Sequence, residues 1–119
     1  MEQLREKGYM VFENVLNEEE VEKAHDLFDT FYDNNSMDVY DTGIIKSNFV
    51  GHLEHAHFIR TRPNIINIFK QLWNCDELIC SFDGTCYMSR EHYYNKYWTH
   101  VDQCYDNTEF SCYQGLVSL

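Results

Sequence analysis

The sequence predicts an α+β domain in which helices come first and strands follow. Apolar residues recur at helical spacing near the start of the chain, and a second periodic stretch begins at a proline. From about residue 77 onward, aromatic and β-branched residues of the kind found in strands dominate. We expect the 119 residues to form one domain, because this length suits a single hydrophobic core.

The first predicted elements are a strand and a helix. Residues 9–15 are rich in β-forming types and follow a glycine, which predicts a strand. Asn17 followed three positions later by Glu20 is typical of a helix cap. The apolar residues that recur after this cap are Val21, Ala24, Leu27, Phe28 and Phe31. Their spacing predicts a helix from about residue 18 to about residue 32.

The middle of the chain is predicted to hold a loop, a short strand and a second helix. Residues 33–43 are polar and contain turn-forming types, and residues 44–50 are a candidate short strand. Pro63 suits the first turn of a helix, where its missing N–H costs nothing. The apolar period that follows continues to Trp73, so we predict a helix over residues 63–73.

The last part of the chain is predicted to form strands. Residues 78–82 precede an Asp-Gly turn signal, and aromatic-rich segments follow at 85–88, 93–101 and 110–119. The last segment is predicted to be a strand with nothing after it. Because a strand needs neighbours to bury its apolar face, we expect the chain to be part of a larger fold, truncated after Leu119.

Charge and cysteine content exclude several classes of function. The formal net charge is -11, with nine basic residues against twenty acidic ones. Nucleic acids and anionic membranes are bound through clustered Lys and Arg, so neither partner is expected. No secretory signal or transmembrane-length apolar segment is visible. Five cysteines, an odd number without a C-x-x-C pair, predict reduced thiols in an intracellular, cytoplasmic protein.

The stretch Trp98-Thr99-His100-Val101-Asp102 carries the strongest chemical signal. Residues two apart in a strand point the same way, so His100 and Asp102 would share a face, with Trp98 as a wall beside them. An imidazole and a carboxylate placed side by side can take adjacent positions on one metal ion. One more histidine would complete the 2-His-1-carboxylate set of ferrous oxygenases. Taken alone, however, the H-x-D tripeptide is better explained as a surface His beside an Asp.

Four stretches, in order along the chain, resemble members of the phytanoyl-CoA dioxygenase family. They are GYMVFENVLNEEEV at 8–21, DELICSFDG at 76–84, YWTHVDQ at 97–103 and YQGLVSL at 113–119. The resemblance implies an incomplete double-stranded β-helix (a jelly roll, cupin-like) preceded by packing helices. It also implies Fe(II) held by His100 and Asp102, with 2-oxoglutarate as cosubstrate and a small molecule as the substrate that is hydroxylated.

The resemblance also implies that this chain holds only part of the site. The family's distal His and the Arg that binds 2-oxoglutarate lie further along its members, and no residue here is assigned to either. Full activity is therefore expected to need residues beyond this chain. One alternative is an inactive fragment or binding module that retains the family's shell, and another is a small zinc-binding interaction domain that uses Cys and His.

Other candidate residues carry weaker signals. Structural zinc could use Cys75, Cys80 and Cys86, although half-buried thiols acting as small apolar residues explain them better. The run His52-Leu53-Glu54-His55-Ala56-His57 could supply a ligand for a divalent ion, but such clusters give many false positives. Three further side chains could serve a site or simply be solvated, and their roles stay open: Arg90, Gln103 and Gln114.

Overall fold

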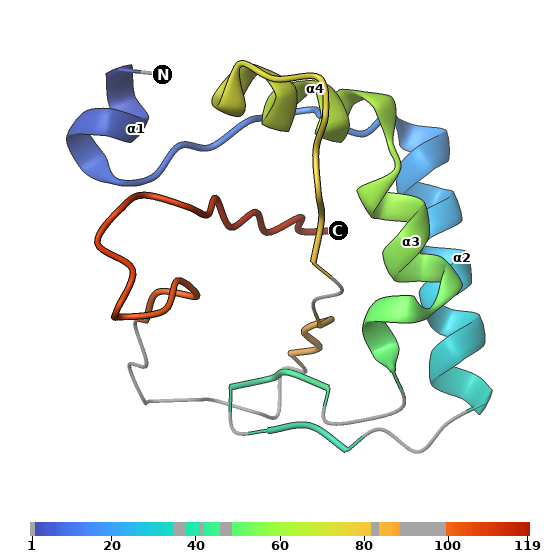
Figure 1. Ribbon diagram of the computed structural model, residues 1–119. Coiled ribbons are helices and arrows are strands. Elements are labelled where there is room, and N and C mark those ends of the chain that lie inside the picture. The colour runs from blue at the N-terminus through green and yellow to red at the C-terminus, as the bar shows by residue number, and fades with distance from the viewer. Residues whose placement is uncertain (1, 35–37, 41, 46–48, 82–83, 89–99) are drawn as a thin grey trace.

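The described part of the protein is a set of short helices centred on α3. The computed structural model describes residues 2–34, 38–40, 42–45, 49–81, 84–88 and 100–119. Within these residues α3 packs against α2, against the 3-10 helix η1 and against α4, whereas α1 contacts none of the other helices (Figure 1). The elements are α1 (Glu2–Lys7), α2 (Glu18–Asn34), η1 (Val50–His52), α3 (Glu54–Arg60) and α4 (Pro63–Trp73).

The predicted α+β class, with its incomplete jelly roll, is wrong for this structure. The described residues form no strand and no sheet, and extended backbone pairs only at two isolated antiparallel bridges, Val39 with Ile45 and Ile44 with Cys86. The segments 9–15, 78–81 and 110–119, which were predicted as strands, are extended or irregular chain. β-forming residues make a strand only where a neighbour takes up their N–H and C=O groups. The described residues provide such a neighbour at the two bridges alone.

The remaining strand predictions also fail or lie outside the described residues. In the predicted strand 44–50, only Ile44 and Ile45 form bridges, and Val50 already belongs to η1. In segment 85–88 only Cys86 forms a β-bridge, with Ile44. The segment 93–101 lies largely within residues 89–99, which are not described, and its last two residues are in irregular backbone.

The two helix predictions are confirmed because both helices carry local start signals. α2 begins at Glu18, where the Asn17 Oδ1 accepts a hydrogen bond from the Glu20 N–H (2.9 Å) and the Glu20 carboxylate accepts one from the Asn17 N–H (3.1 Å). This reciprocal capping box satisfies two N–H groups that a helix start otherwise leaves unpaired. α4 spans Pro63–Trp73, as its proline and apolar period predict. α1 and α3 were not predicted from the sequence. At the start of α3, Leu53 makes no side-chain cap hydrogen bond that could have served as a signal.

The core is small and lies between α2 and α3. Ala24 of α2 is fully buried and Ala56 of α3 is 6% exposed, and such short side chains let two helix backbones approach closely. Next to them is an aromatic cluster in which ring centroids lie between 5.2 and 6.3 Å apart. Its members are Phe28, Phe31, Tyr32, His55 and Tyr87. The cluster joins α2, α3 and the segment 84–88 into one body.

Polar contacts join the start of α2 to the corner between α3 and α4. Arg62 stacks its guanidinium 4.0 Å from the centre of the Phe58 ring and lies 3.8 Å from the Glu20 carboxylate. Asn64 donates a hydrogen bond to the carbonyl of Val15 (2.9 Å). These contacts hold the capped end of α2 beside the first turn of α4. None of the described helices is long and apolar enough to cross a membrane.

We predict that Gly43→Ala destabilises the protein more than Gly8→Ala does. Both glycines have positive φ (81° and 76°), so an added side chain strains the backbone at either site. At Gly43 the new Cβ would also lie 2.9 Å from Met88 Cγ and 3.2 Å from the Tyr87 carbonyl oxygen, whereas at Gly8 nothing lies within 4 Å. We expect the free energy of unfolding, measured in urea, to fall by about 1 kcal/mol for Gly8→Ala and by about 1–3 kcal/mol more for Gly43→Ala. Equal losses would show that segment 84–88 does not pack closely on Gly43.

Candidate metal centre

His100 and Asp102 lie side by side in the structure. The Nε2 atom of His100 is 3.1 Å from Oδ1 of Asp102, and the two side chains are 41% and 35% exposed. Residues 100–103 are irregular backbone with a bend at Asp102, whereas most of the strand expected at 93–101 lies outside the described residues. The two side chains nevertheless meet across one intervening residue. Their role as metal ligands stays a prediction.

The distance between the two donor atoms suits a shared metal ion. Nitrogen and oxygen ligands lie at about 2.1 Å from a divalent first-row ion, so two donors at neighbouring octahedral positions are about 3 Å apart. The observed 3.1 Å matches this separation. Without a metal, the same distance allows the imidazole N–H to donate a hydrogen bond to the carboxylate. A metal ion bound here would replace that proton between the same two atoms.

No third donor joins His100 and Asp102 among the described residues. The part of the chain that the structure describes contains no group of three or more His, Cys, Asp or Glu side chains arranged to hold a metal ion. Trp98, predicted as a wall of the site, and Arg90, a candidate for an anionic substrate, both lie outside the described residues. The described residues therefore show a pair of candidate ligands rather than a complete set.

Gln103, whose role the sequence left open, organises the loop that follows the pair. Its Nε2 group donates hydrogen bonds to the carbonyls of Asn107 (2.8 Å) and Glu109 (2.6 Å), and its Oε1 accepts one from the Ser111 N–H (2.9 Å). The Asn107 side chain adds bonds to Ser111 Oγ (3.0 Å) and the Glu109 N–H (3.2 Å). One carboxamide thus closes residues 103–111 into a loop directly after Asp102. We call this the Gln103 loop.

Aromatic side chains attach the far end of the Gln103 loop to α4. The ring of Trp73, at the end of α4, lies 5.7 Å from that of Phe110 and 4.8 Å from that of Tyr113, and these two rings are 4.7 Å apart. Gly115 continues this contact, because a Cβ there would lie 2.8 Å from Cζ of Phe69. Asp102 and α4 are therefore connected through the Gln103 loop and these rings.

The histidine cluster does not form a metal site in the described structure. His52 belongs to η1, while His55 and His57 belong to α3, where the ring of His55 is buried and His57 is exposed. His55 packs against Phe28 (5.6 Å between ring centroids) and Phe31 (5.2 Å). The helix therefore points these imidazoles in different directions, and His55 serves the core.

His55 is held neutral by its surroundings. Its Nε2 shares a hydrogen bond with Thr85 Oγ1 (3.0 Å), and its buried Nδ1 has no partner among the residues that the structure describes. Burial, and in addition the Arg60 guanidinium, lower the pKa of His55 below its ordinary value of 6.5. A second ring proton would place a charge and an unpaired N–H in the core.

The cysteines offer little support for a structural zinc site. All five are free thiols and all are exposed, so the half-buried positions expected from the sequence are not observed. Cys75 donates a hydrogen bond to the carbonyl of Glu77 and Cys80 donates one to that of Ser81, each at 3.3 Å. Each of these hydrogen bonds joins a thiol to a carbonyl one or two residues further along the same segment.

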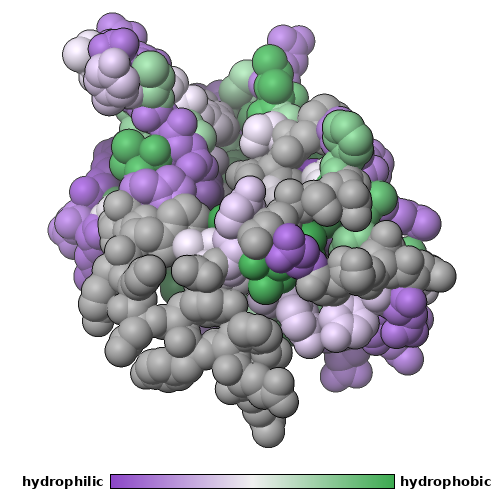
Figure 2. Space-filling model, turned by 90° about the horizontal axis from the view of Figure 1, so that it is seen from below, coloured by the Kyte–Doolittle hydropathy of each residue, from purple (hydrophilic) through white to green (hydrophobic). Residues whose placement is uncertain are grey.

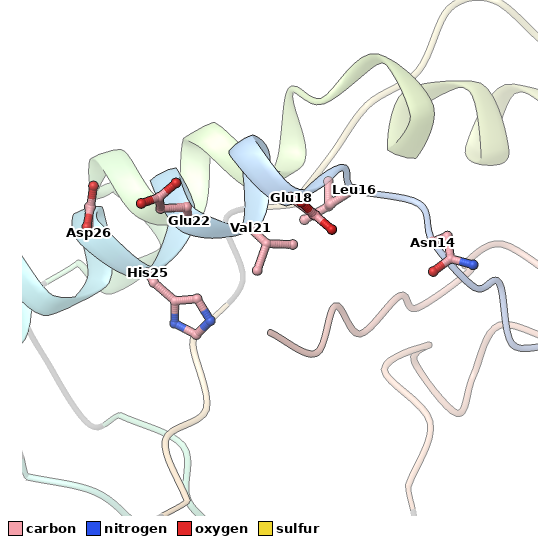
Figure 3. Close-up of a pocket in the computed structure, with 7 residues that line it drawn as sticks. All are labelled: Asn14, Leu16, Glu18, Val21, Glu22, His25 and Asp26. Atoms are coloured by element: carbon pink, nitrogen blue, oxygen red, sulfur yellow. The ribbon is translucent and has the colours of Figure 1, made fainter.

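A shallow depression lies at the start of α2, but its polar groups do not converge. It is lined by Asn14, Leu16, Glu18, Val21, Glu22, His25 and Asp26. In Figure 3 the carboxylates of Glu22 and Asp26 point to one side of the helix, while His25 points to the other side with Val21. Acid and imidazole groups that diverge in this way cannot bind one ion or one substrate atom, so the depression is not a catalytic candidate.

Comparison with known proteins shows a similarity over part of the chain. The chain is 35% identical over 71 residues to Ava biosynthesis cluster protein O of Aspergillus versicolor, a stretch that covers 58% of this chain and 23% of that protein. This chain therefore corresponds to less than a quarter of the length of that relative. No family model matches the chain, and no solved structure matches it. Membership of the phytanoyl-CoA dioxygenase family stays a prediction.

We predict that His55→Phe makes the stability of the protein less sensitive to acid. The pKa of His55 is lower in the folded state than in the unfolded state, so the unfolded chain takes up a proton first as the pH falls. The contribution of His55 to stability is therefore fully present above about pH 6.5 and is lost as the pH falls below it. Between pH 7.5 and pH 5.5, the free energy of unfolding in urea should fall less for the variant than for the wild type. His57→Phe, an exposed position on the same helix, should keep the wild-type loss.

We predict that Gln103→Met opens the Gln103 loop without unfolding the helices. Methionine has a similar length but cannot replace the three hydrogen bonds of the carboxamide, each worth about 1 kcal/mol. The Ser111 amide should exchange with deuterium at least about tenfold faster. Gln114→Met, at an exposed glutamine, serves as the control, and unchanged Ser111 exchange would contradict the role given to Gln103.

Proposed function

We propose that this chain carries part of the iron site of an Fe(II)- and 2-oxoglutarate-dependent dioxygenase that hydroxylates a small molecule. The observation that carries the proposal is the 3.1 Å separation of His100 Nε2 and Asp102 Oδ1. This is the spacing of two adjacent ligands on one ion, and the two donors are of the types that ferrous oxygenases use. Both side chains are exposed enough for an ion to reach them.

The residues of this chain would bind and orient the ion. His100 would donate the lone pair of Nε2, and the Asp102 carboxylate would offset part of the positive charge. The Gln103 loop would limit the movement of Asp102, since it begins at the next residue and is anchored on α4. Iron with 2-oxoglutarate supplies the activation of dioxygen that hydroxylation needs. A further His and an Arg for the cosubstrate are required to complete such a site.

The relative in Aspergillus versicolor supports a small-molecule substrate. The name of that protein places it in a biosynthesis cluster, which agrees with a small-molecule substrate. The similarity extends over 58% of this chain, which is why we transfer the substrate class as a proposal. The net charge of -11 agrees with the choice, since it disfavours a nucleic-acid substrate.

A second candidate is a binding module that retains the ligand pair without catalysis. The observation that favours it is that the described residues bring two metal donors together and not three. Two protein ligands hold a divalent ion less tightly than three, so this candidate predicts weak metal binding and no turnover of 2-oxoglutarate. The small zinc domain remains as a further outcome of the same experiment.

We predict that anaerobic Fe(II) and 2-oxoglutarate produce a metal-to-ligand charge-transfer band that depends on His100 and Asp102. The titration is carried out on this chain and on a longer product that adds residues after Leu119, with the stronger band expected from the longer product. His100→Gln and Asp102→Asn should each abolish the band, because each removes one adjacent ligand.

The controls separate the three candidates. His57→Gln, an exposed histidine away from the pair, should leave the band unchanged. A band without succinate formation in the longer product would favour the binding module. Stoichiometric zinc held by thiolates in the purified protein would favour the zinc domain. No band in either product would reject the oxygenase.

A further inference from the structure

Two short segments of the chain form one unit beside the helices. Residues 43–45 and 84–88 are joined by an antiparallel bridge and by two backbone hydrogen bonds of 2.8 and 3.0 Å. The bonded groups are the Tyr87 N–H with the Gly43 carbonyl and the Ile45 N–H with the Thr85 carbonyl. Because these bonds lie inside the unit, the two segments can move together without losing them. We call this unit the bridged segments.

Side chains attach the bridged segments to the helices. The ring of Tyr87 lies 5.9 Å from that of Phe28 and 5.4 Å from that of Tyr32, both on α2. His55 of α3 shares a hydrogen bond of 3.0 Å with Thr85 Oγ1. The contacts seen between this unit and the helices are therefore ring contacts and one polar contact, in contrast to the backbone bonds within the unit.

The bridged segments lie at the edge of the molecule. In Figure 1 residues 42–45 run along the lower edge, near the lower ends of α2 and α3, and Figure 2 views this side, where hydrophobic side chains reach the surface between hydrophilic ones. In the second segment Thr85 and Tyr87 are half-buried, whereas Cys86 and Met88 are exposed. One face of the unit thus contacts the helices and the other faces water. A unit at the edge can separate from the helices without displacing any of them.

His55 has no place for a second ring proton while the bridged segments are attached. Its side chain is 3% exposed and packs on Phe28 and Phe31. In the imidazolium both ring nitrogens carry a proton. The Nε2–H can donate to Thr85 Oγ1, but the Nδ1–H would be buried without an acceptor among the described residues. Because a buried charge with an unpaired donor is costly, the charged ring must reach water.

The charges around His55 also oppose a second proton. Burial, and in addition the Arg60 guanidinium on the same helix, lower the pKa of His55 below 6.5. Among the described residues no carboxylate acts on the ring to offset them. The elements packed around it contribute phenols, an imidazole and a cation, namely Tyr32 of α2, Tyr87 of the bridged segments, His52 of η1 and Lys70 of α4. The carboxylates of α2 beyond its first turn are exposed, namely Glu22, Asp26, Asp29 and Asp33.

We propose that His55 is a proton-operated switch that holds the bridged segments on α2 and α3 at neutral pH and releases them in acid. The ring is covered on one side by α2, where Ala24 and Ala56 let the two helices approach closely. On the other side it is covered by a unit that only side chains are seen to attach. Opening on that side brings the imidazolium to water while the helices stay packed. The proposal does not depend on the proposed function.

NMR spectroscopy of the whole chain tests the proposal through the ring contacts of Phe28 with Tyr87. Nuclear Overhauser effects between these rings should be present at pH 7.5, disappear as the pH falls to 5 and return when it is raised, while helical circular dichroism stays unchanged. The direction follows from linkage, because the pKa of His55 is about 6.5 in the released state and lower in the attached state. Below about pH 6.5, each pH unit should favour release by up to about tenfold.

Matched variants assign the effect to His55. His55→Gln keeps a polar group near the position of Nε2 but takes up no proton, so the ring contacts should persist at pH 5. Thr85→Val removes the hydrogen bond that favours attachment, so the midpoint of release should rise by about half a pH unit to one unit. His57→Gln changes an exposed histidine of the same helix and should keep the wild-type midpoint.

Four results would overturn the proposal. Ring contacts that persist to pH 5 in the wild type would show that no release occurs, and loss of helical signal together with the contacts would show global unfolding instead. Acid release that continues in His55→Gln would assign the proton to another group. An unchanged midpoint in Thr85→Val would show that the contact between His55 and Thr85 does not hold the unit.

Discussion

The packing of α3 against its neighbours is the constraint on which the described structure depends. α3 contacts α2, η1 and α4, and its residue His55 carries the contact to segment 84–88 through Thr85. The His55 ring packs beside Phe28 and Phe31, and burial lowers its pKa, because a charged ring would lie in a core that offers Nδ1 no acceptor among the described residues. A single buried imidazole thereby links helix packing, loop position and sensitivity to acid.

The ligand pair is connected to this body by a different route. Gln103 closes the loop after Asp102, and Phe110 and Tyr113 attach that loop to Trp73 at the end of α4. α4 in turn packs on α3. Among the described residues, side-chain hydrogen bonds and ring contacts therefore hold the loop that follows Asp102. The proposed iron site needs further ligands in addition to His100 and Asp102.

Local signals explain which parts of the fold were predictable. α2 and α4 carry their own start signals, a capping box at Asn17 and a proline at position 63, followed by apolar residues at helical spacing. α3 has no side-chain cap hydrogen bond at its start, and its packing on α2 and α4 depends on distant parts of the chain. The strand predictions failed because a strand needs a paired neighbour, and the local sequence does not show which distant segment would pair with it. Residues 78–81 and 110–119 have the composition of strands but no paired neighbour in the described chain.

The sequence by itself determined the helix starts, the acidic character and the H-x-D spacing, because each depends on residues close together in the chain. The tertiary structure decided which histidine is buried, since His55 and His57 differ only in the face of α3 that they occupy. It also decided the role of Gln103, whose three hydrogen bonds close a loop. No local sequence pattern predicts that loop. These features depend on which distant groups meet in space, and that depends on the packing of the whole chain.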